Sequence, residues 1–204
     1  LDMRHTFPDL NKLAGDLATG YSKKMPGSSR KEFIMSSTKA LSSATGFISN
    51  VPDLSKLAIS LLNDSKLIST NSKNQIFKRK IKAEKDFYYG FGCEIWPEKG
   101  YDIFSHSGAF AGYKTAIGIS FKHKLGVIIM ANSIDVYPIA YLRGTFDTLI
   151  KLTNKKEKVK KSTKDAERYD GIFYNKWGFV QIAQTSSGLL GFYPSSFRPV
   201  SETF

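Results

Sequence analysis

The pattern of apolar and polar positions changes near residue 87 of this 204-residue chain. Residues 1–40 are polar and mixed, and the first clear periodicity follows them. It is an apolar face at i, i+3, i+4, i+7 and i+8, formed by Leu54, Leu57, Ala58, Leu61 and Leu62. This spacing predicts a helix that begins at Asn50 or at Pro52-Asp53 and ends at Asn63-Asp64.

From residue 87 onward the apolar residues come in short runs rich in β-branched and aromatic side chains. The runs are FYYGFGCEIW (87–96), DIFSHSG (102–108), YKTAIGISF (113–121) and LGVIIMANS (125–133). Glycine, Pro-Glu-Lys-Gly and Lys-His-Lys separate them, and such tight turns predict an antiparallel meander. A helix is expected next, over 137–152, with an apolar stripe of Ile139, Leu142, Phe146, Leu149 and Ile150.

The end of the chain has a different organisation. A basic segment over 153–168 separates the predicted helix from three more strand-like runs in 169–204, YDGIFYN, GFVQIAQ and GLLGFYP. Three short strands bury too little core to fold alone, so this module either docks on the main body or is incomplete. We therefore expect an α+β chain: an antiparallel β-sheet with flanking helices over 1–152, a linker over 153–168, and the start of a β-rich module over 169–204.

Composition and charge narrow the possible functions. The chain is 41% hydrophobic and 24% charged, as in globular proteins, and has no apolar run that could span a membrane. The net charge of +12 raises the possibility of nucleic-acid binding, but much of it lies in segments 73–85 and 155–168. Neither segment interleaves aromatic residues with its lysines, so we expect no specific nucleic-acid partner. Attraction to an anionic membrane or cell-wall polymer is the simpler electrostatic alternative.

Few residues offer metal or thiol chemistry. The single cysteine, Cys93, excludes an internal disulfide and is interpreted as a buried structural thiol. Of the three histidines, His123 is expected to be solvated in a turn, and His5 has no obvious partner. No metal-ligand spacing and no glycine-rich phosphate loop occur, so neither a metal nor a cofactor is expected.

A nucleophilic serine could lie one helical turn before a lysine, in an SxxK pair. The chain has two such pairs, Ser28-Lys31 and Ser36-Lys39. Its 23 serines and 24 lysines give about 2.7 pairs by chance, and neither pair begins an apolar helix. Both are rejected as nucleophiles. By residue type alone, His106-Ser107-Gly108 is a polar strand end with a flexible glycine.

The order of the segments changes that interpretation. LDMRHTF (1–7), DLATGY (16–21), residues 42–63, YGFGCEIW (89–96) and residues 105–133 follow one another as they do in one enzyme family. In this order the chain resembles the C-terminal part of a serine β-lactamase/penicillin-binding-protein-like hydrolase. The most similar branch is the class C-like group of esterases, D-amino-acid peptidases and β-lactamase-related proteins.

The resemblance implies roles for one short stretch. His106 would orient or polarise an acyl substrate, Ser107 would contact it, and Gly108 would keep the strand edge open. The backbone N–H of Ala109 would form one half of an oxyanion hole. The family's SxxK and Tyr-x-Asn elements precede the matched segments, and no Tyr-x-Asn occurs in the chain. The residues Phe110-Ala111-Gly112 replace the usual x-Pro-Gly.

We therefore expect a C-terminal portion of a bacterial serine hydrolase. The whole enzyme would transfer the acyl group of a peptidoglycan peptide, β-lactam or small ester, in the periplasm or cell envelope. The chain alone, without the nucleophile, is expected to be inactive and to associate with a missing N-terminal part or a second copy. Two alternatives are a non-enzymatic cell-wall or protein-binding module and a basic nucleic-acid or anionic-polymer binder.

Overall fold

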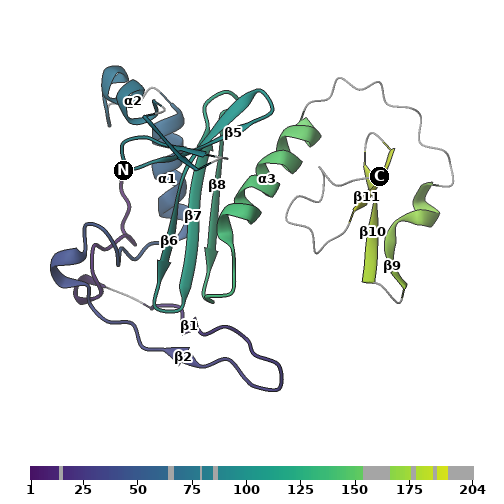
Figure 1. Cartoon of the computed structure of the whole chain (residues 1–204), viewed down its shortest axis with the longest axis horizontal. Coiled ribbons are helices and arrows are strands. Elements are labelled where there is room, and N and C mark those ends of the chain that lie inside the picture. The colour runs from purple at the N-terminus through teal and green to yellow at the C-terminus, as the bar shows by residue number, and fades with distance from the viewer. Residues whose placement is uncertain are drawn as a thin grey trace. The chain divides into compact units, whose positions relative to one another are not determined.

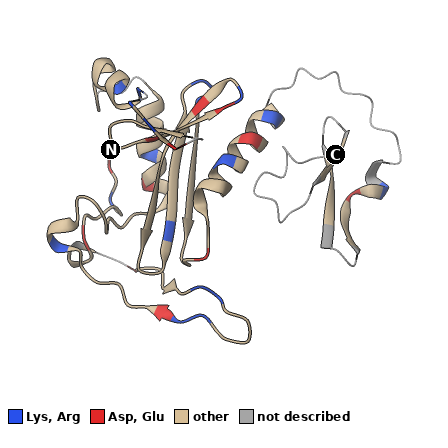
Figure 2. Cartoon of the chain, viewed as in Figure 1, with Lys and Arg blue, Asp and Glu red and all other residues tan. Residues whose placement is uncertain are grey.

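The computed structural model describes residues 1–13, 16–63, 67–78, 80–84, 87–153, 166–175, 178–185 and 188–192. The chain divides into two compact units, Leu1–Leu142 and Arg143–Phe204, and each is described by itself. No helix among the described residues is long and apolar enough to cross a membrane. Figure 2 shows lysine and arginine distributed over helices, loops and strands of the chain, among acidic residues.

The first unit is built on a six-stranded antiparallel sheet in which each strand pairs with its neighbour in sequence (Figure 1). The strands are β3 (Ile81–Glu84), β4 (Phe87–Tyr89), β5 (Glu94–Glu98), β6 (Tyr101–Phe110), β7 (Tyr113–Ser120) and β8 (Leu125–Ala131). The predicted meander and the predicted α+β class are confirmed.

The interpretation of residues 87–96 as one strand was wrong. These residues form two antiparallel strands, β4 and β5, because the chain reverses between them. Gly92 takes a φ of +67°, and the Gly90 N–H donates to the Cys93 carbonyl at 2.8 Å. The glycines in the run YGFGC therefore mark a turn.

Helix α1 (Val51–Leu62) lies where its periodicity predicts. Asn50 is the N-cap, and its side chain accepts the Asp53 N–H at 2.9 Å. Ala58 is buried, and a Cβ added at Gly126 of β8 would lie 3.1 Å from the Ala58 Cβ. The helix can therefore lie close to β8 because both facing residues are small.

Helix α3 (Pro138–Thr153) crosses the boundary between the two units. In its first turns, Leu142 fills the space over Gly118 of β7, where an added Cβ would meet Leu142 at 2.9 Å. The predicted stripe is buried at four positions, Ile139, Leu142, Phe146 and Ile150, whereas Leu149 is 37% exposed.

Shorter elements complete the first unit. They are η1 (Leu10–Lys12), β1 (Gly20–Tyr21), β2 (Glu32–Phe33), η2 (Lys39–Leu41) and α2 (Thr70–Ile76). Strands β1 and β2 pair with each other, and the Tyr21 N–H donates to the Asn132 carbonyl at 2.9 Å. This bond ties β1 to the chain just after β8.

The second unit contains a three-stranded antiparallel sheet in the order β11-β10-β9. Its strands are β9 (Gly171–Asn175), β10 (Gly178–Thr185) and β11 (Gly188–Phe192), preceded by η3 (Ala166–Tyr169). The three strands coincide with the three predicted runs. Of the predicted linker, residues 154–165 lie outside the described residues, as do residues 193–204 at the end of the predicted module.

Candidate active site

The hairpin between β6 and β7 sets the direction of the β6 backbone groups. Ala111 and Gly112 form a two-residue turn with φ values of +34° and +96°, as type I′ hairpins require. The closing pair Phe110–Tyr113 is therefore hydrogen-bonded, and in an antiparallel ladder such pairs alternate. It follows that the even-numbered residues of β6 bond to β7, and that Ser107 and Ala109 direct their backbone groups to the other side.

The hairpin between β5 and β6 gives the same result independently. Glu98 and Tyr101 close a second two-residue turn, so the odd-numbered residues of β6 face β5. Pairing with β5 ends at Glu94 and Ser105, and no described strand covers this side of β6 beyond that point. The N–H groups of Ser107 and Ala109 thus lie on an open strand edge.

A cavity of about 830 Å³ borders this open edge. Strand β6 contributes Ser107, Gly108, Ala109 and Phe110 to its wall. Residues 43–51 and His5, Phe7, Leu13, Asp16, Leu17, Ala18 and Met35 line other parts of the wall, together with Tyr113, Thr115, Met130, Ala131 and Asn132. The structure therefore brings three of the four predicted site residues into one cavity.

Gly108 lies within β6, which continues to Phe110, so the interpretation by residue type alone, a polar strand end with a flexible glycine, was wrong. It pairs with Thr115 of β7, and a Cβ added at Gly108 would lie 2.5 Å from the Thr115 Oγ1. A larger residue would displace the threonine from the cavity wall. Glycine at this position therefore keeps the wall open.

His106, the fourth predicted residue, is exposed and is not part of the cavity lining. Its Nδ1 lies 2.7 Å from the Ser107 carbonyl oxygen, and its Nε2 lies 2.8 Å from the Tyr89 hydroxyl oxygen. Because a carbonyl only accepts, Nδ1 carries the hydrogen, and in the neutral ring Nε2 accepts from Tyr89. His106 is thus held at the rim of the site by Tyr89, whose pKa is raised mainly by burial.

Tyr89 and Glu94 contact predicted site residues, His106 and Ser107, and sequence reasoning missed both. Ser107 donates its hydroxyl to Glu94 Oε1 at 3.2 Å, and the Trp96 indole N–H donates to Oε2 at 3.2 Å. Ser105 reaches the same Oε2 at 3.5 Å. The only sequence signal for Glu94 was one acidic residue in the otherwise uncharged run FYYGFGCEIW.

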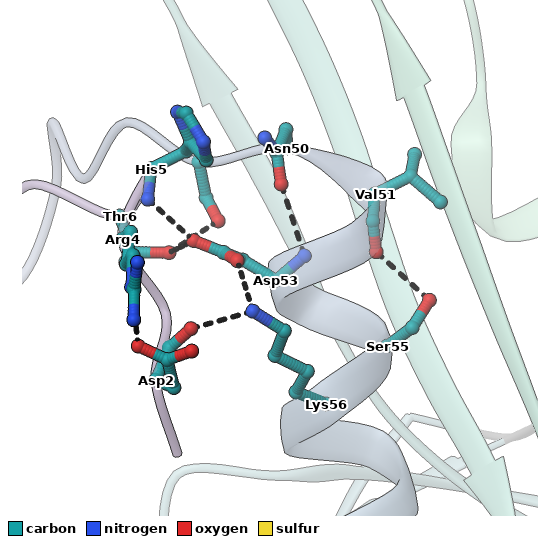
Figure 3. A network of polar contacts seen from close by, with 10 residues as sticks. Asp2, Arg4, His5, Thr6, Asn50, Val51, Asp53, Ser55 and Lys56 are labelled. Carbon is teal, nitrogen blue, oxygen red and sulfur yellow. Dashed lines mark hydrogen bonds and ion pairs between the residues drawn. The ribbon is translucent and has the colours of Figure 1, made fainter.

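Another part of the cavity wall, at His5 and Asn50, is held by Asp53, which is 1% exposed at the start of α1. Figure 3 shows its carboxylate between α1 and the N-terminal segment. It accepts the His5 N–H at 2.7 Å, the Thr6 hydroxyl at 3.0 Å and the Lys56 ammonium at 3.2 Å. Burial acts to raise the pKa of Asp53, but the bonds from His5, Lys56 and Thr6 hold it below its usual value. His5, expected to lack a partner, is therefore anchored through its backbone.

Comparisons with known proteins show the family and the fold. The Beta-lactamase family model matches residues 1–172. The chain belongs to the beta-lactamase family. The resemblance inferred from the order of the segments is confirmed, and the fold is that of β-lactamase and penicillin-binding-protein-like serine hydrolases.

Two solved structures resemble this beta-lactamase family chain. An octameric penicillin-binding protein homologue from Pyrococcus abyssi gives a TM-score of 0.61 at 18% identity, over 99% of this chain and 46% of its own. A penicillin-binding protein from Bacillus halodurans gives a TM-score of 0.55 at 19% identity. The match covers 69% of this chain and 43% of the Bacillus halodurans chain. The chain thus spans about half the length of these structures. A comparison with curated proteins finds no match.

A serine hydrolase of the beta-lactamase family needs an activated serine. The serines that line the cavity among the described residues are Ser43, Ser49 and Ser107, and none has its hydroxyl bonded to a lysine, histidine or tyrosine. Neither Ser28 nor Ser36 lines the cavity. Ser28 donates its hydroxyl to the Met25 carbonyl instead.

The remaining reactive groups have structural roles. Cys93 is buried, as predicted, and burial raises its pKa to about 12, so its thiol is unreactive near neutral pH. His123, expected to be solvated, is partly buried: its Nδ1 lies 3.3 Å from the Ser120 hydroxyl, and its ring lies 4.7 Å from that of Tyr101. Its pKa is lowered, mainly by burial. No group of three or more metal-ligating side chains occurs in the described part of the chain.

Proposed function

We propose that this chain forms the substrate-binding wall of a serine acyl-transfer site, with the acyl substrate lying along the open edge of β6. The observation that carries the proposal is the unpaired edge at Ser107–Ala109, which borders a cavity of about 830 Å³. An extended substrate can add to such an edge through main-chain hydrogen bonds. A peptidoglycan peptide, a β-lactam or a small ester all carry an acyl group that can lie there.

Each residue of this edge has a distinct role in the proposal. The Ala109 N–H donates to the acyl oxygen as charge develops on it, which is the interaction of an oxyanion hole. Gly108 leaves space for the substrate, and Ser107 contacts it through its hydroxyl. His106 is a positioning residue, because its ring holds the Ser107 carbonyl and is itself held by Tyr89.

The nucleophile in this proposal comes from outside the 204 residues. The support for it is chemical: among the described residues, no cavity serine has its hydroxyl hydrogen-bonded to a lysine, histidine or tyrosine that could activate it as a nucleophile. We infer that another segment of the protein, or another chain, brings an activated serine to the open side of the cavity. The chain by itself would then bind an acyl substrate without turning it over.

Two measurements on the 204-residue chain test this function. A fluorophosphonate probe, which labels activated serines, is expected to leave the chain unlabelled. Titration with N-acetyl-D-alanine methyl ester, followed by ¹H–¹⁵N NMR, is expected to shift the amides of Ser107, Gly108 and Ala109. The amides of β10 serve as the internal control. Covalent labelling of a serine, or amide shifts only outside the cavity, would contradict the proposal.

A further inference from the structure

We propose that the site selects acyl substrates that carry an ammonium group beside the acyl centre and rejects those that carry a carboxylate there. This inference rests on the proposed function, because it assumes that the substrate lies along β6. It concerns the charge of the substrate and goes beyond the acyl transfer itself.

The first observation is the charge of the cavity wall. The chain has 30 lysines and arginines against 18 acidic residues. Despite this excess, no lysine or arginine is among the described residues that line the cavity, and the charged residue found there is Asp16. A site for a substrate carboxylate is expected to supply a cation, and this wall supplies an acid.

The second observation is the direction of the hydrogen bond made by Ser107. Its hydroxyl donates to Glu94 at 3.2 Å, so its proton is not available to a substrate carboxylate, while its oxygen can still accept from an N–H group. Trp96 also donates to Glu94, at 3.2 Å. No lysine or arginine forms an ion pair with Glu94 in the described part of the chain. An ammonium group bound at Ser107 would therefore lie close to a carboxylate that has no cationic partner.

One cation lies near this edge and provides the rival hypothesis. Lys114 stands opposite Ala109 in the β6–β7 ladder. Like Glu94, it is not part of the cavity lining, but Glu94 accepts the hydroxyl of the lining residue Ser107, so in the proposed arrangement the substrate lies beside Glu94 and Lys114 does not bind it. If Lys114 did anchor a substrate carboxylate, its replacement by glutamine would weaken the binding of an acidic probe.

The test compares three probes of similar size with the 204-residue chain at fixed ionic strength. D-alanine methyl ester carries an ammonium group, N-acetyl-D-alanine methyl ester is neutral, and N-acetyl-D-alanine carries a carboxylate. Dissociation constants come from the NMR shifts of the amides at 107–109. We expect the ammonium probe to bind about tenfold more tightly than the carboxylate probe, as one favourable charge interaction predicts.

Variants of the chain test which residues cause the preference for the ammonium probe. Glu94→Gln removes the negative charge and is expected to raise the dissociation constant of the ammonium probe about tenfold. The dissociation constant of the neutral probe should change by less than about twofold. Ser107→Ala removes the accepting oxygen and is expected to weaken the binding of the ammonium probe. It tests the same preference if Glu94→Gln does not fold. Glu98→Gln, on the same strand at its far end, is the matched control and should change none of the constants.

The outcomes separate this inference from the proposed function. Equal or tighter binding of the carboxylate probe overturns the charge preference but leaves the acyl site in place. The same conclusion follows if folded Glu94→Gln binds the ammonium probe like the unmodified chain, or if Lys114→Gln weakens the carboxylate probe. If no probe shifts the amides at 107–109, the proposed function fails and the inference fails with it.

Discussion

Replacing Ala109 by proline removes one N–H group from the edge of β6. The two hairpins direct this N–H away from β7, so its loss should leave the β6–β7 ladder intact. Proline is tolerated on strand edges for this reason. Ala109→Gly keeps the N–H and serves as the matched control.

The size of the effect follows from the single hydrogen bond that is lost. A neutral hydrogen bond contributes about 0.5–1.5 kcal/mol net, so the variant should bind N-acetyl-D-alanine methyl ester about two- to thirteenfold more weakly. In a complete enzyme with a nucleophile, loss of an oxyanion donor costs more, about 2.7–4 kcal/mol or about 10²–10³ in kcat. The two magnitudes differ because the acyl oxygen gains charge only in the transition state.

The assay is the same NMR titration, with thermal unfolding to show that the variant folds. Hydrogen exchange tests the geometry directly: the amides of Ser107 and Ala109 should exchange faster than those of His106 and Gly108, which bond to β7. A folded Ala109→Pro variant that binds as tightly as Ala109→Gly would refute the reasoning. So would strong protection of the Ala109 amide in the free chain.

Three further predictions concern the framework of the site. The thiol of Cys93, with a pKa of about 12, should react with Ellman's reagent at pH 8 only as the protein unfolds, and a rapid reaction without denaturant would contradict its burial. Ile103→Ala, at a position that is 0% exposed, should lower the free energy of unfolding by about 2–5 kcal/mol in urea titrations, and a loss below about 1 kcal/mol would show that this core position is loosely packed. The pKa of Asp53 is lower in the folded state, so its contribution to stability is complete above about pH 3.9 and is lost as the pH falls through the folded value. Asp53→Asn should therefore lose less stability than the unmodified chain between pH 5 and 3 in urea titrations, and an equal loss would exclude this role.

The parts of the fold that the sequence predicts correctly depend on local signals. The start of α1 follows from Asn50, whose side chain caps a helix only three residues away. The β6–β7 hairpin follows from Gly112, because a two-residue turn needs positive φ. The signal at residues 90–93 was also local, but the apolar residues on either side of the glycines were taken for one continuous strand.

The composition of the site depends on contacts between distant residues, and this part could not be predicted. His106 meets Tyr89 across 17 positions in the sequence, and His5 meets Asp53 across 48. No periodicity encodes such distances, because they depend on where strands and loops end in space. The predicted role of His106 came through the resemblance alone, and the structure adds that its two ring nitrogens already have partners.

The different lengths of two neighbouring strands explain both the open edge and its charge. Strand β5 has five residues and β6 has ten, so half of β6 extends beyond its partner. Proteins usually cover or block such edges, whereas this one carries the small residues Ser107, Gly108 and Ala109 beside a cavity. The residue that ends β5 on this side is Glu94, and its carboxylate therefore lies where the unpaired edge begins. The end of β5 that leaves the Ala109 N–H unpaired thus also places a carboxylate beside Ser107, so the proposed substrate binding and the proposed charge selection have one structural cause.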